Sequence, residues 1–211
     1  MREARIWLHA LSANYLTLND CRVKQVFACA AKALMTYILR MPQSTSPQID
    51  RMTSRDWDQV REIFAEGMAT GNATFETELP AWEVWDSSHI KSPRLVVRDG
   101  ARVLAWAALT PVSARRVYQG VAEASVYVRS SARRSGIGSQ LMAALIAASE
   151  EEGFWTLQAH IFPENEASLS LVRKFGFRDV GVRKRLGQMN GVWRDVLLLE
   201  RRSDEELTTD N

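Results

Sequence analysis

One short segment, residues 133–138, constrains the fold of this chain most strongly. Its sequence, Arg-Arg-Ser-Gly-Ile-Gly, follows an apolar stretch at residues 124–128 that predicts a strand and precedes a helical pattern at residues 139–152. Glycines let a backbone turn tightly and approach a ligand, and the first N–H groups of a helix have no intrahelical partner. The helix dipole adds partial positive charge at the same place. A strand, a glycine turn and a helix in this order therefore predict a phosphate-binding site.

The spacing of the glycines excludes the two commonest phosphate-binding loops. The segment lacks the Lys-Ser/Thr pair that completes a Walker A loop, and it has no third glycine at the dinucleotide-binding position. The spacing Arg-x-x-Gly-x-Gly resembles instead the acetyl-CoA pyrophosphate loop of the GCN5-related N-acetyltransferases (GNAT).

The resemblance extends over residues 49–199 and is strongest to the phosphinothricin and methionine sulfone N-acetyltransferases of that superfamily. Besides the loop, the segments that carry it are residues 72–77 (NATFET), 122–128 (AEASVYV), 162–168 (FPENEAS) and 174–177 (KFGF). The resemblance implies the GNAT fold, an α/β (or α+β) architecture in which helices flank a mixed, mostly antiparallel sheet that splays at the acetyl-CoA site. It also implies acetyl-CoA as cosubstrate and no metal.

The periodicity along the chain predicts the order β-α-α-β-β-β-α-β-α-β-β. After a first strand near Ile49, Ser54 is expected to cap a helix that ends near residues 67–71. Gly153 and Gly176 are expected to end later helices. The remaining predicted elements are a helix at 81–90, a hairpin at 95–109, the strand holding Glu123, the helix at 139–152, a strand at 154–161, a helix at 165–175 and a hairpin at 178–200.

The first 46 residues differ in composition from the rest of the chain. They contain few acids, and their apolar run at residues 26–39, interrupted by Lys32, is too short for a membrane span. The segment fits an added amphipathic helix, an atypical targeting segment or an artefact upstream of a true start at Met41, and we favour the artefact. We expect the catalytic domain at residues 47–202 and a disordered acidic tail at 203–211.

Composition limits the partners of this chain. The 27 Lys and Arg residues against 25 Asp and Glu give a pI near 8.7, without the dense basic face of a nucleic-acid-binding protein. We therefore expect neither a nucleic-acid nor a membrane partner. The only cysteines, Cys21 and Cys29, lie before the predicted domain, which indicates a reducing, cytoplasmic location. His160 is predicted on a strand face, and no cluster has metal-ligand spacing.

Acetyl transfer to an amine first requires a proton acceptor, because amines are protonated near pH 7. Glu123 stands in an otherwise apolar strand and matches the residue that serves as base in the resembling enzymes, although it would also fit a solvated carboxylate. Arg134 could equally be an ordinary exposed arginine, and Asn165 could equally cap its helix. The resemblance assigns cofactor binding to Val126, Tyr127, Val128, Arg133, Arg134, Ser135, Gly136, Ile137, Gly138, Ser139, Asn165 and Ser168.

The acceptor site is predicted from two further segments. Thr74, Phe75 and Glu76 match the loop that covers the acceptor in the resembling enzymes, and Arg115 or Arg116 could hold a carboxylate through paired hydrogen bonds. Phe75 could equally belong to the core, and the arginines to a solvated turn. Enzymes resembling this chain are homodimers whose acceptor pocket is completed near the subunit contact, so we expect a homodimer.

One position departs from the resembling family. Val172 stands where the wider superfamily has tyrosine and the phosphinothricin group has histidine, and valine cannot donate a proton. Either the thiolate leaves without a protein acid, or Tyr127 or a water substitutes. We expect an N-acetyltransferase acting on the α-amine of a small amino acid such as phosphinothricin, methionine sulfone or methionine sulfoximine. The alternatives are an enzyme that acetylates a protein N-terminus or other amine, and a non-catalytic acyl-CoA sensor.

Overall fold

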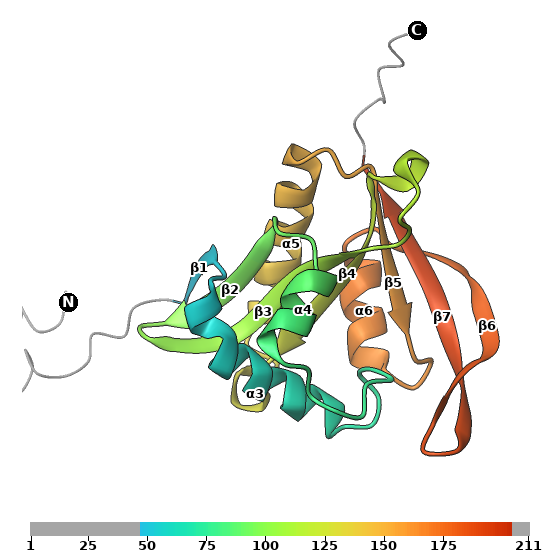
Figure 1. Cartoon of the computed structure of the whole chain (residues 1–211), viewed down its shortest axis with the longest axis horizontal. Coiled ribbons are helices and arrows are strands. Elements are labelled where there is room, and N and C mark those ends of the chain that lie inside the picture. Colours follow the sequence, from blue (N-terminus) through green and yellow to red (C-terminus); the bar gives the residue numbers. More distant parts are fainter. Residues whose placement is uncertain (1–46, 204–211) are drawn as a thin grey trace, which may run out of the picture. The chain divides into compact units, whose positions relative to one another are not determined.

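The computed structural model describes residues 47–203, which form one seven-stranded sheet with helices on both faces (Figure 1). The predictions for residues 1–46, including a start at Met41, and for residues 204–211 lie outside the described residues. The division of the chain into an extension, a domain and a tail therefore stays a prediction.

The strands follow the order β1-β2-β3-β4-β5-β7-β6. Every neighbouring pair is antiparallel except β4 and β5, which are parallel. The strands are β1 (Gln48–Arg51), β2 (Arg94–Asp99), β3 (Arg102–Pro111), β4 (Val121–Val128), β5 (Thr156–Ile161), β6 (Arg178–Met189) and β7 (Val192–Arg202). The α-helices are α3 (Trp57–Met68), α4 (Trp82–Ser88), α5 (Ile137–Glu151) and α6 (Glu166–Lys174). The predicted order of elements and the α/β fold class are confirmed.

The sheet splits between its two parallel strands. Pairing of β4 with β5 begins at Val121 opposite Thr156 and ends at Glu123 opposite Gln158. Beyond that point both strands continue, and they diverge in Figure 1. The splayed sheet expected from the sequence is therefore present, and Glu123 lies where the two strands part.

Two apolar cores pack on the opposite faces of the sheet, and β3 contributes to both. Ala105, Ala107 and Leu109 pack with α5 and α6, whereas Trp106 and Ala108 pack with α3 and α4. Side chains of a strand alternate between faces, so a central strand covered on both sides must be apolar throughout. Packing on both faces therefore holds β3, and through it the paired edge of β4, in a fixed position beside the split in the sheet.

Several element boundaries differ from those predicted. Helix α5 begins at Ile137, two residues before the predicted start, and α4 occupies only Trp82–Ser88. The predicted cap at Ser54 is wrong, because Ser54 opens a short 3-10 turn and the Thr53 N–H donates to the carboxylate of Asp56 at 2.8 Å. A threonine followed three residues later by an acid is the capping-box pattern, so the signal lay one residue earlier.

A Gly67→Ala substitution tests the packing of α3 against β4. Alanine is favoured over glycine in a helix by about 1 kcal/mol. Here the new Cβ would lie 2.7 Å from the ring of Tyr127, which stacks on Trp106 and meets the edge of Phe64. Overpacking costs about 1–3 kcal/mol, so we expect a net loss of about 1 kcal/mol in the free energy of unfolding, measured in urea.

The matched control is Gly181→Ala in β6, where an added Cβ meets no atom within 4 Å. We expect its unfolding free energy to stay within about 0.5 kcal/mol of the wild-type value. A Gly67→Ala protein more stable than wild type would contradict the packing of Tyr127 against α3.

Candidate active site

The open edge of β4 presents backbone N–H groups that lack a neighbouring strand. The Arg129 N–H donates to the Leu104 carbonyl of β3 at 2.8 Å, which fixes the direction of every second residue of β4. By this alternation the N–H groups of Val126 and Val128 point toward the β5 side, beyond the last β4–β5 pair. Unpaired strand amides are costly when buried without a partner and so make good ligand sites.

Tyr127 is turned the other way. Its backbone faces β3, opposite Trp106, and its hydroxyl donates to the Ala73 carbonyl at 3.3 Å. Its ring stacks on Trp106 with 4.6 Å between centroids. Burial is the main cause that raises the pKa of the Tyr127 phenol well above its ordinary value. Of the three β4 residues predicted to bind the cofactor, Tyr127 thus packs between the sheet and α3 instead of facing the open edge.

The loop that follows β4 is held at its entrance by α3. Arg129 pairs with Glu62 at 3.0 Å and with Glu66 at 3.5 Å, and the Ser130 N–H donates to Glu66. Burial is the largest single influence and would raise the pKa of the Glu66 carboxyl, but the hydrogen bonds with Ser130 and the charges of Arg129 and Arg133 together outweigh it, so this pKa lies below its ordinary value. The carboxylate therefore stays charged at neutral pH and anchors the start of the loop.

The glycine loop has the backbone geometry of an anion site. Gly136 has φ 87° and forms the N-cap of α5, and its carbonyl accepts hydrogen bonds from Ser139 and Gln140. The N–H groups of Ile137 and Gly138 precede these bonds in the first turn, where no intrahelical acceptor is available. Arg133, Arg134 and Ser135 are exposed beside them. Arg133 Nε donates to the Val128 carbonyl, and the Ser135 hydroxyl to the Ala132 carbonyl.

Glu123 forms an ion pair that the sequence did not predict. Its Oε2 lies 3.0 Å from Nδ1 of His160 on β5, and the two side chains are 36% and 23% exposed. His160 Nε2 in turn lies 3.5 Å from Nη1 of Arg183 on β6. The sequence predicted His160 on a strand face, but its proximity to Glu123, two residues beyond the Gln158 partner of Glu123, depends on the register of two parallel strands, which no local signal gives.

The connection between α3 and α4, residues 69–81, folds back over the open edge. The Asn165 amide donates to the Asn72 carbonyl at 2.9 Å and accepts from the Ser168 N–H at 3.2 Å. Asn165 therefore does cap α6, and its amide group is used within the chain. Phe75 packs edge-on against Phe162 with 4.8 Å between centroids. We call residues 69–81 the α3–α4 loop.

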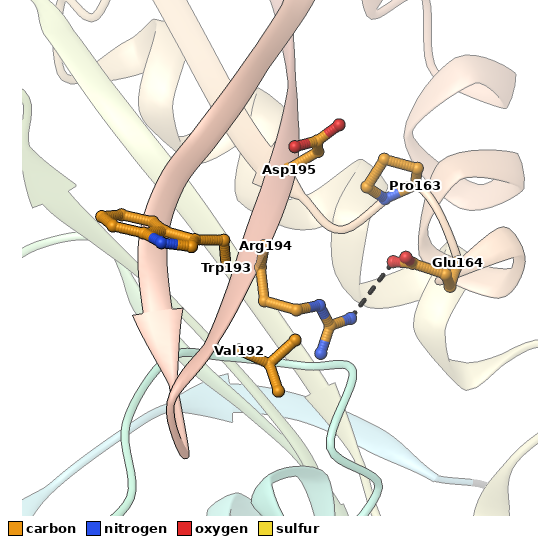
Figure 2. Close-up of a pocket in the computed structure, with 6 residues that line it drawn as sticks. All are labelled: Pro163, Glu164, Val192, Trp193, Arg194 and Asp195. Carbon is orange, nitrogen blue, oxygen red and sulfur yellow. Dashed lines mark hydrogen bonds and ion pairs between the residues drawn. The ribbon is translucent and has the colours of Figure 1, made fainter.

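Arg194 of β7 fastens the α3–α4 loop from the other side. It donates to the Gly71 carbonyl and to Asn72 Oδ1, both at 3.0 Å, and its guanidinium lies 4.2 Å from the centroid of Phe162. Figure 2 shows its ion pair with Glu164, 3.1 Å long, beside a pocket of about 560 Å³. The pocket is lined by Pro163, Glu164, Val192, Trp193, Arg194 and Asp195.

The two predicted parts of the acceptor site lie at opposite ends of β4. Thr74 and its neighbours adjoin Tyr127 near the end of the strand. Arg115 and Arg116 are exposed in the connection that precedes its first residue, Val121. Six residues of strand span about 20 Å. The described residues therefore do not bring the arginines against the α3–α4 loop within one chain.

The position that departs from the resembling family is part of the core. Val172 is 4% exposed and packs with Leu169 and Phe177 in the cluster beneath α5 and α6. Between residues 47 and 203 no group of three or more His, Cys, Asp or Glu side chains could hold a metal ion. Within the same residues no helix has both the length and the apolar character needed to cross a bilayer.

Comparison with known proteins identifies relatives of this architecture. Residues 57–177 match the acetyltransferase (GNAT) family. An L-methionine sulfoximine/L-methionine sulfone acetyltransferase from Pseudomonas aeruginosa is 34% identical over 140 residues, which are 63% of this chain and 81% of that protein.

Two solved structures share the fold over most of their length. A GNAT superfamily phosphinothricin acetyltransferase from Sinorhizobium meliloti, in complex with acetyl-CoA, has a TM-score of 0.68 and 27% identity, covering 75% of this chain and 89% of its own. A ribosomal-protein-alanine N-acetyltransferase from Brucella melitensis has a TM-score of 0.69 and 30% identity, covering 74% and 99%.

Proposed function

Because this chain belongs to the acetyltransferase (GNAT) family and is an acetyl-CoA-dependent N-acetyltransferase, we propose that it acetylates the α-amine of a small amino acid. The acceptor we propose is of the phosphinothricin, methionine sulfone or methionine sulfoximine kind, as the names of similar proteins indicate. The observation that carries the proposal is the position of Glu123, at the point where β4 and β5 separate and beside the open strand edge.

The chain's own groups fit acetyl-CoA, which supplies an activated acetyl group. The N–H groups of Val126 and Val128 form an edge of donors for the amides of the pantetheine arm and for the acetyl oxygen. The first turn of α5, with Gly136 in the left-handed conformation, suits the pyrophosphate. Arg133 and Arg134 add positive charge beside it.

Glu123 is proposed as the group that takes the proton from the acceptor amine. An amine attacks only when neutral, and a carboxylate within reach serves as acceptor, directly or through one water. The side chain is partly exposed at the mouth of the split sheet, so an acceptor can approach it. An accessible carboxylate at this place argues against the alternative of a non-catalytic acyl-CoA sensor.

The second candidate acceptor is a protein N-terminus. The solved ribosomal-protein-alanine N-acetyltransferase that shares this fold favours a protein N-terminus as the alternative acceptor. The proposal of a small amino acid is supported by Phe75, which packs on Phe162 and closes part of the proposed acceptor side. It is also supported by Arg115 and Arg116, whose guanidinium groups can each donate two hydrogen bonds to a carboxylate. A long peptide needs an open groove, whereas a small acid needs a closed pocket with a few donors.

We further propose a symmetric homodimer that completes the acceptor pocket. Exposed apolar side chains gather in the connection before β4, where Val117 is 66% exposed, and on the β6–β7 hairpin, where Trp193 is 55% exposed. Burial of such surface favours association. The distance of Arg115 and Arg116 from the α3–α4 loop of their own chain also supports a contribution from a partner. Light scattering that gives the mass of one chain at micromolar concentration would refute the dimer.

The proposed location is the cytoplasm. It is supported by the sequence after Cys29, which contains no cysteine and therefore no disulfide partner for an oxidising compartment.

Two glycines at opposite ends of α5 test the phosphate site. Gly136 and Gly153 have φ angles of 87° and 83°, and an added Cβ at either meets no atom within 4 Å. Aspartate at either position is strained by about 1–2 kcal/mol, so both variants should lose similar stability. We expect Gly136→Asp to weaken acetyl-CoA binding by about a hundredfold or more, because its carboxylate enters an anion site. Gly153→Asp should bind normally in calorimetry, and equal affinities would contradict the site.

The acceptor proposal is tested by thiol release from acetyl-CoA with four acceptors: methionine sulfone, phosphinothricin, methionine sulfone amide and an alanine-led peptide. We expect both free acids to turn over and the amide to lose about thirtyfold in kcat/KM, which corresponds to about 2 kcal/mol for a lost charge-assisted pair. Equal rates for methionine sulfone and its amide, with fast turnover of the peptide, would favour the protein N-terminus. Acetyl-CoA binding without any turnover would favour a sensor.

A further inference from the structure

His160 contacts the proposed base across the split in the sheet. Its Nδ1 lies 3.0 Å from Glu123 Oε2, and among residues 47–203 this is the only ion pair or hydrogen bond of the Glu123 carboxylate. The contact spans two parallel strands just where their pairing ends, two residues beyond the Gln158 partner of Glu123. An ion pair this exposed adds only about 0–1 kcal/mol to stability, so stability alone does not account for its placement.

Arg183 lies beside the second ring nitrogen of His160. Nη1 of Arg183 lies 3.5 Å from Nε2 of the imidazole. A guanidinium has only donors, so the nitrogen that faces it presents a lone pair, and in the neutral ring the proton then sits on Nδ1. The charged groups placed against His160 are Glu123 from β4 and Arg183 from β6, and its partner on β7 is the apolar Leu198.

We propose that His160 is a positioning residue that donates its Nδ1–H to Glu123 Oε2 and so directs Oε1 toward the acceptor amine. This inference rests on the proposed role of Glu123. The amine proton passes to Glu123, and His160 keeps its own proton throughout. A carboxylate on a partly exposed strand face would otherwise rotate among several rotamers, and the proposed hydrogen bond, formed across the 3.0 Å ion-pair distance, would remove that freedom before the acceptor arrives. The imidazole thus comes from β5. The position on α6 that is histidine in the phosphinothricin group is here the buried Val172.

Substitutions at His160 distinguish the role of its N–H donor from the role of its side-chain volume. His160→Leu removes the donor and should lower kcat about tenfold to a hundredfold, the range for a misplaced catalytic group. His160→Asn keeps an N–H close to the place of Nδ1 and should restore kcat to within about threefold of wild type. KM for acetyl-CoA and the melting temperature should barely change in either variant. Both variants are assayed with whichever of the four acceptors the wild-type enzyme turns over fastest.

A second pair of variants tests the tautomer. Arg183→Gln replaces the guanidinium with an amide whose oxygen can accept, so it should release the proton from Nδ1 and lower kcat. Lys184→Gln, at the adjacent residue on β6, removes the same charge from an exposed side chain that makes no hydrogen bond or ion pair within residues 47–203, and it should have wild-type kcat. Nitrogen-15 NMR of the histidines in the free wild-type enzyme should show the His160 proton on Nδ1, a readout that does not depend on any acceptor.

Glu123→Gln, measured in parallel, distinguishes failure of the proposed base from failure of the inference about His160. Wild-type turnover by Glu123→Gln would overturn the proposed base, and the positioning role with it. A slow Glu123→Gln enzyme beside a His160→Leu enzyme with wild-type kcat would overturn only the inference about His160. Equal loss in His160→Leu and His160→Asn, with both variants folded and binding acetyl-CoA, or a proton found on Nε2, would overturn it too.

Discussion

The end of β4–β5 pairing at Glu123 is the constraint on which the rest of the site depends. A parallel pair that continued to Val128 would satisfy the amides of Val126 and Val128 within the sheet and leave nothing to bind a ligand. Because the strands part, one edge of β4 keeps free backbone N–H donors while its other edge stays paired to β3. The cores on the two faces of β3 keep this half-paired strand in place.

The same separation explains why the site is assembled from so many segments. The opening leads along β4 to the glycine loop, whose entrance is held by Glu62 and Glu66 of α3. On its other side it is bounded by β5 and by the first residues of α6. The α3–α4 loop bridges the two sides through Asn165 and Arg194. Elements on both faces of the sheet thus converge on a gap that none of them could form alone.

Local sequence predicted what depends on local chain geometry. The glycine loop, the order of elements and the glycine ends of α5 and α6 follow from turns and periodicity, and they are present. The family resemblance supplied Glu123. Its contact with His160 was not predicted, because the register of parallel strands is set by packing far away in sequence. Alternation along β4 distinguishes Tyr127 from Val126 and Val128, but the packing of its ring beneath α3 follows from a core that distant segments form.

Arg194 joins the α3–α4 loop, which is the proposed acceptor side, and the β6–β7 hairpin into a single non-contiguous unit. The α3–α4 loop contacts an arginine from β7 and the phenylalanine that follows β5, and Gly187 of β6 leaves space for the ring of Phe75. A Cβ at residue 187 would lie 2.9 Å from that ring. Transplanting the loop alone between related enzymes would leave it without its support. On the proposed assignment of this loop to the acceptor, a change of acceptor range, in evolution or by engineering, requires the loop and the hairpin to change together.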